Sequence, residues 1–262
     1  MRCEETMNES DSFAVWRTQF TVETSQCDLS GSWKLSSLMV KMQDAANEHC
    51  RALGVVRNDL TAKNAAWVLF KSDIVIDRYP GIGERLNVQT FTKGAQMKFY
   101  PRYYVMTDAQ GAVFCRAGSL WMLMDKTTRK TLTQSESGVT LPHADMDAPV
   151  KISPLSKQIQ GIETKSQYRP QYSDIDVNGH VNNTRYGEWL CNQLGIEFMK
   201  RHAFGVISID YSYEVLPDDL LDCALVMNDR EIQYSGYAQG KKKFSIYCGT
   251  RPRIVPDRGK TA

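Results

Sequence analysis

Asp28-Leu-Ser-Gly-Ser32 and Asp176-Val-Asn-Gly-His180 are two similar motifs, one in each half of the chain, and a helix-like stretch follows each of them. After the first motif, apolar side chains recur at three- and four-residue steps from residue 35 to residue 53, and Gly54 follows as a stop signal. This spacing is that of one face of an α-helix, so it predicts a long amphipathic helix over 35–53.

The stretch after the second motif has the same character over a shorter length. Asn182 or Asn183 is placed to cap a helix, and the apolar pattern runs through Tyr186 and Trp189 to Gly195. Asparagine side chains accept hydrogen bonds from the free N–H groups of a first helical turn. The sequence therefore predicts a second helix in the equivalent position, and with it an internal duplication.

Strand-like segments follow each predicted helix. Two of them, 67–77 and 205–214, end on an acid (Asp77 and Glu214) that stands three residues before a proline. The other predicted strands are 13–24, 85–93, 97–108 and 112–125 in the first half, and 163–172, 221–228, 231–238 and 243–250 in the second. Each copy therefore pairs one amphipathic helix with an antiparallel meander, which is a two-layer α+β arrangement.

The repeat also predicts how the chain is divided. We expect a first domain over 13–141 and a second over 163–262, which includes a basic tail. Residues 142–162 are rich in proline, aspartate, lysine and serine, which is typical of a linker. Residues 1–12 are expected to form a flexible leader.

Composition excludes several classes of protein. Of the 262 residues, 42% are hydrophobic, 24% charged and 10% aromatic, which is typical of a folded globular protein. The formal net charge of +2 gives no indication of nucleic-acid binding, and no apolar run is long enough to span a membrane. The seven cysteines are widely spaced without a CxxC pair, and the N-terminus lacks an apolar signal segment. We therefore expect reduced thiols and a cytoplasmic protein.

Several common catalytic patterns are missing from the sequence. It contains no GxSxG, no Walker A loop and no HExxH. The four histidines include no close pair, so a metal site would have few ligands. The sequence predicts neither a metal nor a cofactor.

The segment Tyr172-Ser-Asp-Ile-Asp-Val-Asn-Gly-His-Val-Asn-Asn-Thr-Arg-Tyr186 is dense in side chains that can bind a reacting carbonyl group. A polar turn that merely starts a helix is the alternative explanation. The segment resembles the pattern of the acyl-acyl-carrier-protein thioesterases of plants and bacteria. These enzymes have two tandem hot-dog domains and release free fatty acid from the carrier protein. The resemblance extends over about residues 13–250 and includes the duplication.

The resemblance implies one active site, built from the second copy. Asp176, Asn178 and His180 match the family's Asp-x-Asn-x-His pattern, and Glu214 corresponds to its acid on the following strand. The first copy has other residues at the equivalent positions: Asp28, Ser30, Ser32 and Asp77. Serine cannot replace an imidazole as a proton-sharing group, so we expect the first copy to lack catalysis. The residue after the acid is Val215, which excludes a nucleophilic cysteine there.

The implied reaction is hydrolysis of a thioester by base-activated water. Glu214 is expected to activate the water together with His180, and the roles of these two groups can be exchanged. Asn178 and the backbone N–H groups near Gly179 and His180 are expected to donate hydrogen bonds to the oxyanion. Asp176 is expected to orient His180 or Asn178.

The fatty chain needs an apolar site. Candidate tunnel residues come from the first copy: Met39, Met42, Trp67, Phe70 and the segment Trp121-Met-Leu-Met124. Core packing is the alternative role for each of them. Each buried methylene contributes about 0.8 kcal/mol, so the depth of such a tunnel can select chain length.

The implied partner is an acyl carrier protein that bears a fatty acyl-phosphopantetheine. Carrier proteins are acidic, and the end of this chain is rich in cations: Lys241, Lys242, Lys243, Arg251, Arg253, Arg258 and Lys260, against Asp257. A docking face and a solvated tail both explain this cluster. An acyl-CoA thioesterase of the same fold, a related dehydratase and a non-catalytic acyl-binding regulator are the alternative functions, and a homodimer is left open.

Overall fold

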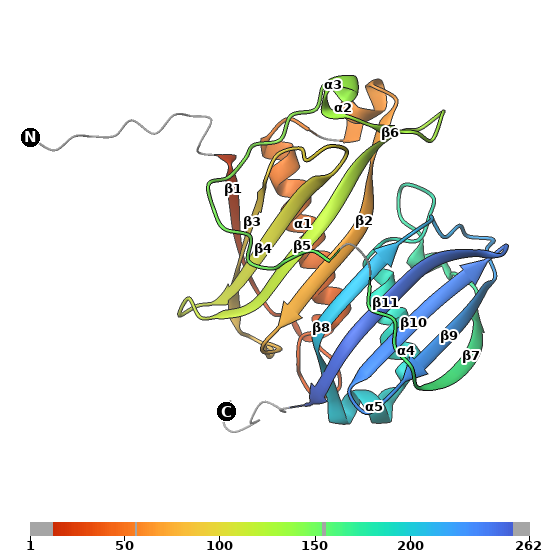
Figure 1. The fold of residues 1–262 in the computed structure, drawn as a ribbon. Helices are drawn as coiled ribbons and strands as arrows, with labels where there is room; N and C mark the ends of the chain where they lie inside the picture. The colour runs from red at the N-terminus through yellow and green to blue at the C-terminus, as the bar shows by residue number, and fades with distance from the viewer. Residues whose placement is uncertain (1–12, 56, 154–155, 254–262) are drawn as a thin grey trace, which may run out of the picture.

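An antiparallel sheet runs through the whole molecule (Figure 1). The computed structural model describes residues 13–55, 57–153 and 156–253, and the predicted leader and the tail beyond Arg253 lie outside them. The first half contributes β1 (Val15–Thr21), β2 (Ala65–Ile76), β3 (Arg85–Thr92), β4 (Tyr100–Asp108), β5 (Val113–Asp125) and β6 (Thr131–Leu132). The second half contributes β7 (Ile162–Tyr168), β8 (His202–Tyr211), β9 (Leu221–Met227), β10 (Glu231–Ala238) and β11 (Lys241–Pro252).

The strand order is the same in both halves when it is followed from the centre of the sheet outward. It is β2-β5-β4-β3-β1 in the first half and β8-β11-β10-β9-β7 in the second. The halves join where β2 pairs with β8, from Lys71 opposite Asp210 to Val75 opposite Val206. The predicted duplication and α+β fold, with two tandem hot-dog units, are confirmed.

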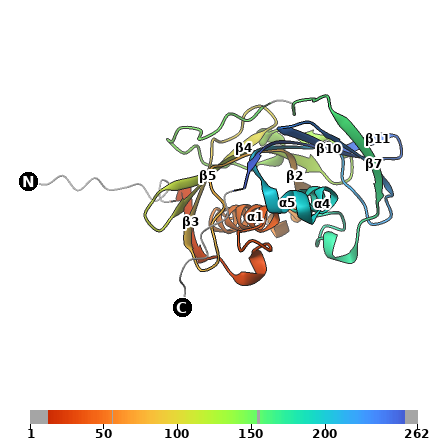
Figure 2. The same ribbon diagram turned by 90° about the horizontal axis from the view of Figure 1, so that it is seen from below.

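Three helices cover one face of this sheet, as Figure 2 shows. They are α1 (Leu35–Ala52) in the first half, and α4 (Arg185–Leu194) and α5 (Ile196–Arg201) in the second. The short helices α2 (Arg57–Ala62) and α3 (Gln134–Ser137) lie at one end of the first half (Figure 1). A 3₁₀ turn precedes each of the two motifs, at Thr24–Gln26 and at Tyr172–Asp174.

Helix α1 forms where the apolar spacing predicts it, and it ends one residue early, at Ala52. The buried face carries the predicted stripe: Leu35, Leu38, Met39, Met42, Ala45, Ala46 and His49. Gly54 follows the helix with φ of 67°, a left-handed conformation that glycine adopts without steric cost. The stripe packs on the sheet and forms the main core together with the second half.

Two of the boundaries that differ from the prediction bear on the motif and on Glu214. Strand β8 ends at Tyr211 instead of reaching Glu214, because the N–H groups of Ser212 and Tyr213 both donate to the Lys243 carbonyl and the chain leaves the ladder. Glu214 therefore lies in a loop and not on a strand. The N-cap of α4 is Thr184 and not one of the two asparagines before it. The reason is an Asx turn before the helix, in which Asn182 Oδ1 accepts from Thr184 N at 3.0 Å.

The segment between the halves crosses the sheet on the face opposite the helices (Figures 1 and 2). It covers Lys71 of β2, whose side chain is fully buried at the seam with β8. Lys71 Nζ lies 2.6 Å from Asp210 Oδ1 and 2.9 Å from Ser208 Oγ. Ser156 N of the connecting segment donates to Asp210 Oδ2 at 3.0 Å. A buried ion pair therefore ties the connecting segment to both halves.

Candidate active site

The loop that carries the second motif is organised around Asp176. Its Oδ1 accepts from Asn178 N at 2.8 Å, and its Oδ2 accepts from Asn182 Nδ2 at 3.1 Å. Gly179 N donates to Asp176 O at 3.0 Å, and its φ of 80° is a left-handed conformation that favours glycine. Asp176 therefore shapes the loop that presents Asn178 and His180.

His180 has one ring nitrogen engaged and one open. Nδ1 lies 3.1 Å from Val181 O, and because a carbonyl oxygen only accepts, Nδ1 carries the proton of this hydrogen bond. Nε2 then holds a lone pair, and no hydrogen bond to it comes from the described part of the chain. Asp176 Oδ1 is 4.0 Å from Nδ1, which is too long for a direct hydrogen bond.

One predicted donor to the oxyanion has a partner within the loop. The N–H group of Gly179 is already used, because it donates to Asp176 O within the turn. The N–H group of His180 makes no backbone hydrogen bond to any residue that the structure describes. Of the two predicted main-chain donors, the one of His180 is therefore the one left without a partner among the described residues.

A buried acid that the sequence analysis missed holds the loop against α4. Asp174 is 1% exposed and accepts four hydrogen bonds, from Tyr168 Oη, Gln171 N, Arg185 Nε and Trp189 Nε1, at 2.8–3.2 Å. Burial acts to raise the pKa of Asp174, but these hydrogen bonds outweigh it and hold that pKa below its usual value. Its place two residues before Asp176 is the only sequence signal, since no spacing rule predicts its partners.

Glu214 reaches the motif through its neighbour in the chain. Val215 is fully buried, and its carbonyl accepts from Val181 N at 2.9 Å. This hydrogen bond joins the loop after β8 to the residue that follows His180. The two loops that carry the predicted catalytic groups are therefore tied together.

Two cations that the sequence analysis did not assign to the active site hold Glu214. Arg129 Nη2 lies 2.7 Å from Glu214 Oε2, and it comes from the turn between β5 and β6 of the first copy. Lys243 Nζ donates to the main-chain oxygen of Glu214 at 3.0 Å and pairs with the buried Asp219 at 2.9 Å. The side chain and the main chain of Glu214 thus have separate anchors.

The charges of Glu214 and of the motif act on the same buried phenol, that of Tyr186. Burial, followed by the negative charges of Glu214 and Asp219, raises the pKa of Tyr186, and Asp176 acts in the same direction. Among the residues described, no hydrogen bond joins Glu214 directly to the motif side chains. The structure therefore brings the predicted residues into one region without joining them in a preformed chain of hydrogen bonds.

The first copy keeps the turn without the imidazole. Asp28 Oδ1 accepts from Ser30 N at 2.8 Å, and Gly31 has φ of 77°, as Gly179 has 80°. Arg253 of the second copy lies 2.5 Å from Asp28 Oδ2 and also donates to Ser30 Oγ. The polar groups of this loop are therefore occupied by an arginine.

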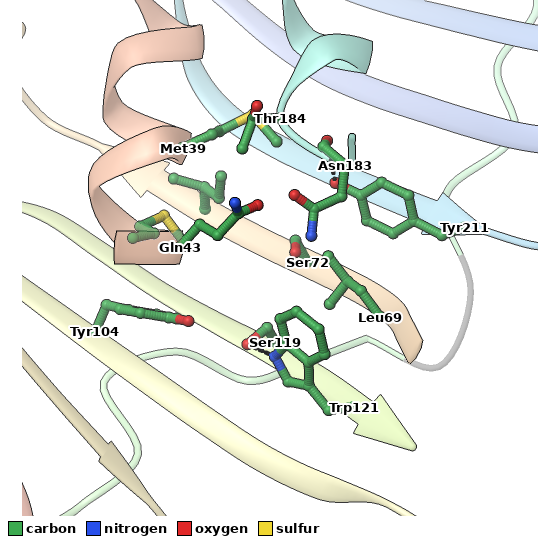
Figure 3. A pocket seen from close by; sticks show the side chains of 12 residues that line it. Met39, Gln43, Leu69, Ser72, Tyr104, Ser119, Trp121, Asn183, Thr184 and Tyr211 are labelled. Carbon is green, nitrogen blue, oxygen red and sulfur yellow. Dashed lines mark hydrogen bonds between the residues drawn. The ribbon is translucent and has the colours of Figure 1, made fainter. Parts of the chain in front are cut away.

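A small cavity lies beside the motif, between α1, the start of α4 and the sheet (Figure 3). Met39 and Met42 of α1 lie in its wall, and Figure 3 shows the amides of Gln43 and Asn183 facing one another across it. Its volume of about 30 Å³ has room for water but not for an acyl chain. Methionine side chains are flexible, so this wall is of a kind that can rearrange.

Two aromatic residues predicted for the acyl tunnel do not line this cavity. Trp67 is outside the lining of this cavity and packs edge-on against Tyr100, with the ring centroids 4.9 Å apart. Phe70 packs on Phe99 at 5.4 Å. Trp121, on β5, does line the cavity. Alternation along a strand tells which side chains share a face of the sheet. The local twist and the position of α1 decide which side chains on that face reach the cavity.

The basic end of the chain is largely engaged inside the protein. Lys243 pairs with Asp219, and Arg253 pairs with Asp28. Arg251 Nη2 donates to the carbonyl of Asp77 at 2.6 Å. Lys241 and Lys242 lie over the rings of Tyr213 and Tyr237 at the β10–β11 turn. Arg258, Lys260 and Asp257 lie outside the described residues. Three of the predicted docking cations therefore have internal partners.

The described residues contain no cluster of ligands suited to a metal ion. Their cysteines are unpaired. Burial, followed by the nearby Glu188, raises the pKa of the Cys191 thiol to about 12, which disfavours the thiolate. None of the helices in the described part is long and apolar enough to cross a membrane.

Two family models match this chain. The model of the acyl-ACP thioesterase N-terminal domain matches residues 14–136, and that of the C-terminal domain matches residues 157–246. The chain belongs to the acyl-ACP thioesterase family. The motif loop and Glu214 lie in the part matched by the C-terminal domain of this thioesterase family, whereas α1 and the methionine wall lie in the part matched by the N-terminal domain.

Curated relatives agree with this assignment. The palmitoyl-acyl carrier protein thioesterase of Gossypium hirsutum is 24% identical over 229 residues, which cover 82% of this chain and 55% of the relative. The corresponding thioesterase of Arabidopsis thaliana is 26% identical over 222 residues, which cover 79% and 54%. Both are chloroplastic proteins. The chain spans about half the length of the curated relatives it matches.

Solved structures share the fold of this thioesterase family member over nearly its whole length. An acyl-ACP thioesterase from Bacteroides thetaiotaomicron superimposes with a TM-score of 0.82 at 22% identity, covering 92% of this chain and 99% of that one. The 12:0-ACP thioesterase from Umbellularia californica gives 0.80 at 21% identity, covering 92% and 98%. The tandem arrangement is therefore a known fold.

Proposed function

We propose that this protein hydrolyses the thioester of a fatty acyl-acyl-carrier protein and releases the free fatty acid, which ends chain growth. One observation carries the proposal. His180, with its open Nε2, and Glu214 stand on two loops that the Val181–Val215 hydrogen bond of 2.9 Å ties together. Two proton acceptors beside a turn with free donors are what hydrolysis by activated water requires.

A water molecule held by these groups attacks the carbonyl carbon of the thioester. Glu214 or His180 Nε2 accepts a proton from the water as the new C–O bond forms. The tetrahedral intermediate then collapses, the C–S bond breaks, and the proton passes to the departing sulfur of phosphopantetheine. Asn178 Nδ2 and the His180 N–H group are the proposed donors to the oxyanion, at about 3 kcal/mol for one such donor.

The two copies have different tasks in this proposal. Residues 13–141 form the domain that accepts the acyl chain, 142–162 form the linker, and 163–262 form the catalytic domain. The chain enters beside Met39 and Met42, where the methionine side chains rearrange to enlarge the small cavity. Because the two loops belong to one chain, the proposed activity does not require a dimer.

The proposed partner is an acidic acyl carrier protein that presents the acyl-phosphopantetheine. Lys241 and Lys242 begin β11, directly after the β10–β11 turn, and Lys241 Nζ is 5.3 Å from the ring of Tyr213, the residue before Glu214. Cations at this turn can attract an acidic partner to the mouth of the site. Docking of this kind weakens as ionic strength rises.

The test is to incubate the purified protein with a ladder of acyl-carrier thioesters and the matching coenzyme A thioesters. We expect release of fatty acid from the carrier thioesters, with a lower kcat/KM for coenzyme A. Glu214→Gln and His180→Ala should each lower kcat by about 10²–10⁴-fold, because each removes a proton acceptor from the water. Product analysis by mass spectrometry identifies the chain length.

The matched control is Asp218→Asn, the same carboxylate-to-amide change on an exposed side chain four residues further along the loop. It should keep wild-type turnover, and all three variants should keep the thermal unfolding midpoint of the wild type. Near-normal kcat in either Glu214→Gln or His180→Ala would contradict the assigned role. Tight acyl binding without turnover in the wild type would favour an acyl-binding regulator instead.

A further inference from the structure

The side chain of Glu214 is held by a residue of the other copy. Arg129 Nη2 lies 2.7 Å from Glu214 Oε2, and the two residues are 85 positions apart. Arg129 is 56% exposed and Glu214 31%. Exposed ion pairs of this kind contribute little to the stability of the fold, so stability does not explain this contact.

The turn that carries Arg129 is rigidly built. Asp125 Oδ1 accepts from Thr127 N at 3.0 Å and from Thr128 N at 2.6 Å, and Arg129 N donates to Asp125 O at 2.9 Å. Asn64 Nδ2 also donates to Asp125 Oδ2 at 3.1 Å, which anchors the turn to the start of β2. Arg129 itself has φ of 60°, a left-handed conformation that is rare for a residue with a side chain. The turn therefore fixes the direction in which Arg129 leaves the main chain.

The contact engages one carboxylate oxygen and leaves the other open. Arg129 bonds only Oε2, and within the described residues no group donates to Oε1. The pair of Arg78 and Glu84 shows the contrast, because there one nitrogen contacts both oxygens, at 2.8 and 2.7 Å. Lys243 fixes the Glu214 main chain but not its carboxylate. The direction of Oε1 is thus set by Arg129 alone.

The motif loop of the first copy is likewise contacted by an arginine from the other copy. Arg253 follows β11, the last strand of the second copy, and reaches Asp28 in the first motif. Arg129 follows β5, the corresponding strand of the first copy, and reaches the site of the second. In the first copy the arginine also bonds Ser30 and fills the loop. In the second it stays at the edge and holds a single oxygen.

We propose that Arg129 is a positioning residue, supplied by the first copy, that directs Glu214 Oε1 towards the reacting water. This inference rests on the proposed function and adds to it. It makes the catalytic site a composite of both copies, in which a residue outside the motif decides whether the base is correctly aimed. Misplacement of a reacting group by about 1 Å can cost 10²-fold in rate, so the effect should fall on kcat.

The test compares Arg129→Ala, Arg129→Lys, Glu214→Gln and the double variant Arg129→Ala/Glu214→Gln in steady-state hydrolysis of an acyl-carrier thioester. Arg129→Ala should lower kcat by about 10- to 100-fold with KM changed less than about twofold. Lysine should restore part of the loss, because it supplies one charged donor. The double variant should have the kcat of Glu214→Gln alone, since the arginine acts only through that carboxylate.

The matched control is Lys130→Ala, which removes one positive charge from the same exposed turn and from a side chain with no ion pair to Glu214. It should leave kcat unchanged. Wild-type kcat in Arg129→Ala would reduce the contact to a surface ion pair. A higher kcat would show that the contact with Arg129 restrains Glu214 instead of aligning it for catalysis. A rise in KM alone, equal to that of Lys130→Ala, would make Arg129 part of a docking surface. Each of these results overturns the proposal.

Crystal structures of the wild type and Arg129→Ala give a readout that does not depend on activity. The Glu214 carboxylate should be ordered in the wild type, and it should move or lose its density in the variant. If the wild type cleaves no thioester, the proposed function fails, whereas the carboxylate position still decides whether Arg129 orients it. An unmoved, ordered carboxylate in Arg129→Ala overturns the inference.

Discussion

Arg102 is a buried cation whose partner is a histidine. Its Nη1 lies 2.9 Å from His49 Nδ1 and 3.3 Å from Thr90 Oγ1, and no described acid pairs with it. Because arginine only donates, His49 Nδ1 accepts, and Nε2–H donates to Phe13 O at 2.7 Å. Burial, with the Arg102 charge as the second cause, lowers the pKa of His49 to about 4. The folded protein therefore contains a neutral histidine on the buried face of α1.

We expect the free energy of unfolding to fall as the pH falls from about 7.5 to 4.5, and to fall less in His49→Gln. An unfolded histidine gains a proton in this range, whereas folded His49 stays neutral until about pH 4, so the unfolded state binds more protons. The contribution is about 2–3 kcal/mol. Glutamine keeps an acceptor for Arg102 and a donor for Phe13. Urea unfolding at both pH values measures the difference, and parallel losses in the two proteins would refute it.

The residues of the site divide by what the sequence can reveal. His180 belongs to a local motif, and Glu214 belongs to a repeated acid-x-x-Pro pattern, so both can be identified from sequence. Arg129 and Lys243 cannot, because each reaches Glu214 from a distant segment and no spacing records the contact. The buried Asp174 is within the motif segment, but its importance lies in burial and in four donors. Local chemistry is predictable, and partners across the sheet are not.

At the scale of elements, apolar periodicity predicted the long helix better than the short one. Helix α1 presents a continuous buried stripe over five turns, so its limits follow from the pattern. Helix α4 has only ten residues, and an Asx turn delays its start to Arg185. The strands follow their apolar runs, but β8 ends early because a carbonyl of β11 takes two N–H groups. Where contacts with a neighbouring segment set the end of a helix or strand, the local sequence pattern does not predict that end.

Gly187 allows α1 and α4 to approach closely, and Gly187→Val should separate them. A Cβ there would lie 3.0 Å from Met39 Sδ and 3.1 Å from Leu35 Cδ2. Alanine requires only small shifts of the Met39 and Leu35 side chains, whereas valine adds two methyl groups to a packed contact and should cost about 1–3 kcal/mol. Thermal unfolding should show a clear loss for valine and a small one for alanine. Asn192→Val, on the exposed face of α4, controls for the helix propensity of valine. An equal loss in that control would exclude the packing explanation.

At the scale of the molecule, the two copies form one unit through contacts that a duplicated sequence does not announce. The sequence predicts two similar domains and a linker, but the domains share a sheet where β2 pairs with β8. The connecting segment is bound to the buried Lys71 and Asp210 at that seam. Edge pairing between domains depends on which strands lack neighbours, and that follows only from the complete strand order.

Arg253 makes one of the contacts between the two copies, and Arg253→Ala should lower the stability of the fold. Its side chain is 6% exposed and lies 2.5 Å from Asp28. Burial acts to raise the pKa of Asp28, but hydrogen bonds from Ser30 and Arg253 outweigh it and hold that pKa low. Loss of the arginine should cost roughly 2 kcal/mol or more at neutral pH, because a mostly buried carboxylate loses its cation. A carboxylate whose pKa is lowered by folding stabilises the folded protein at pH values above its pKa in the unfolded state. This stabilisation is lost as the pH falls through the pKa of the folded state. The difference in unfolding free energy between wild type and variant should therefore narrow in acid, as urea unfolding at neutral and strongly acidic pH can measure.

Arg230→Ala is the matched control, because it removes the same charge from an exposed side chain. An equal loss of stability in that variant would show that net charge, and not the contact with Asp28, explains the result.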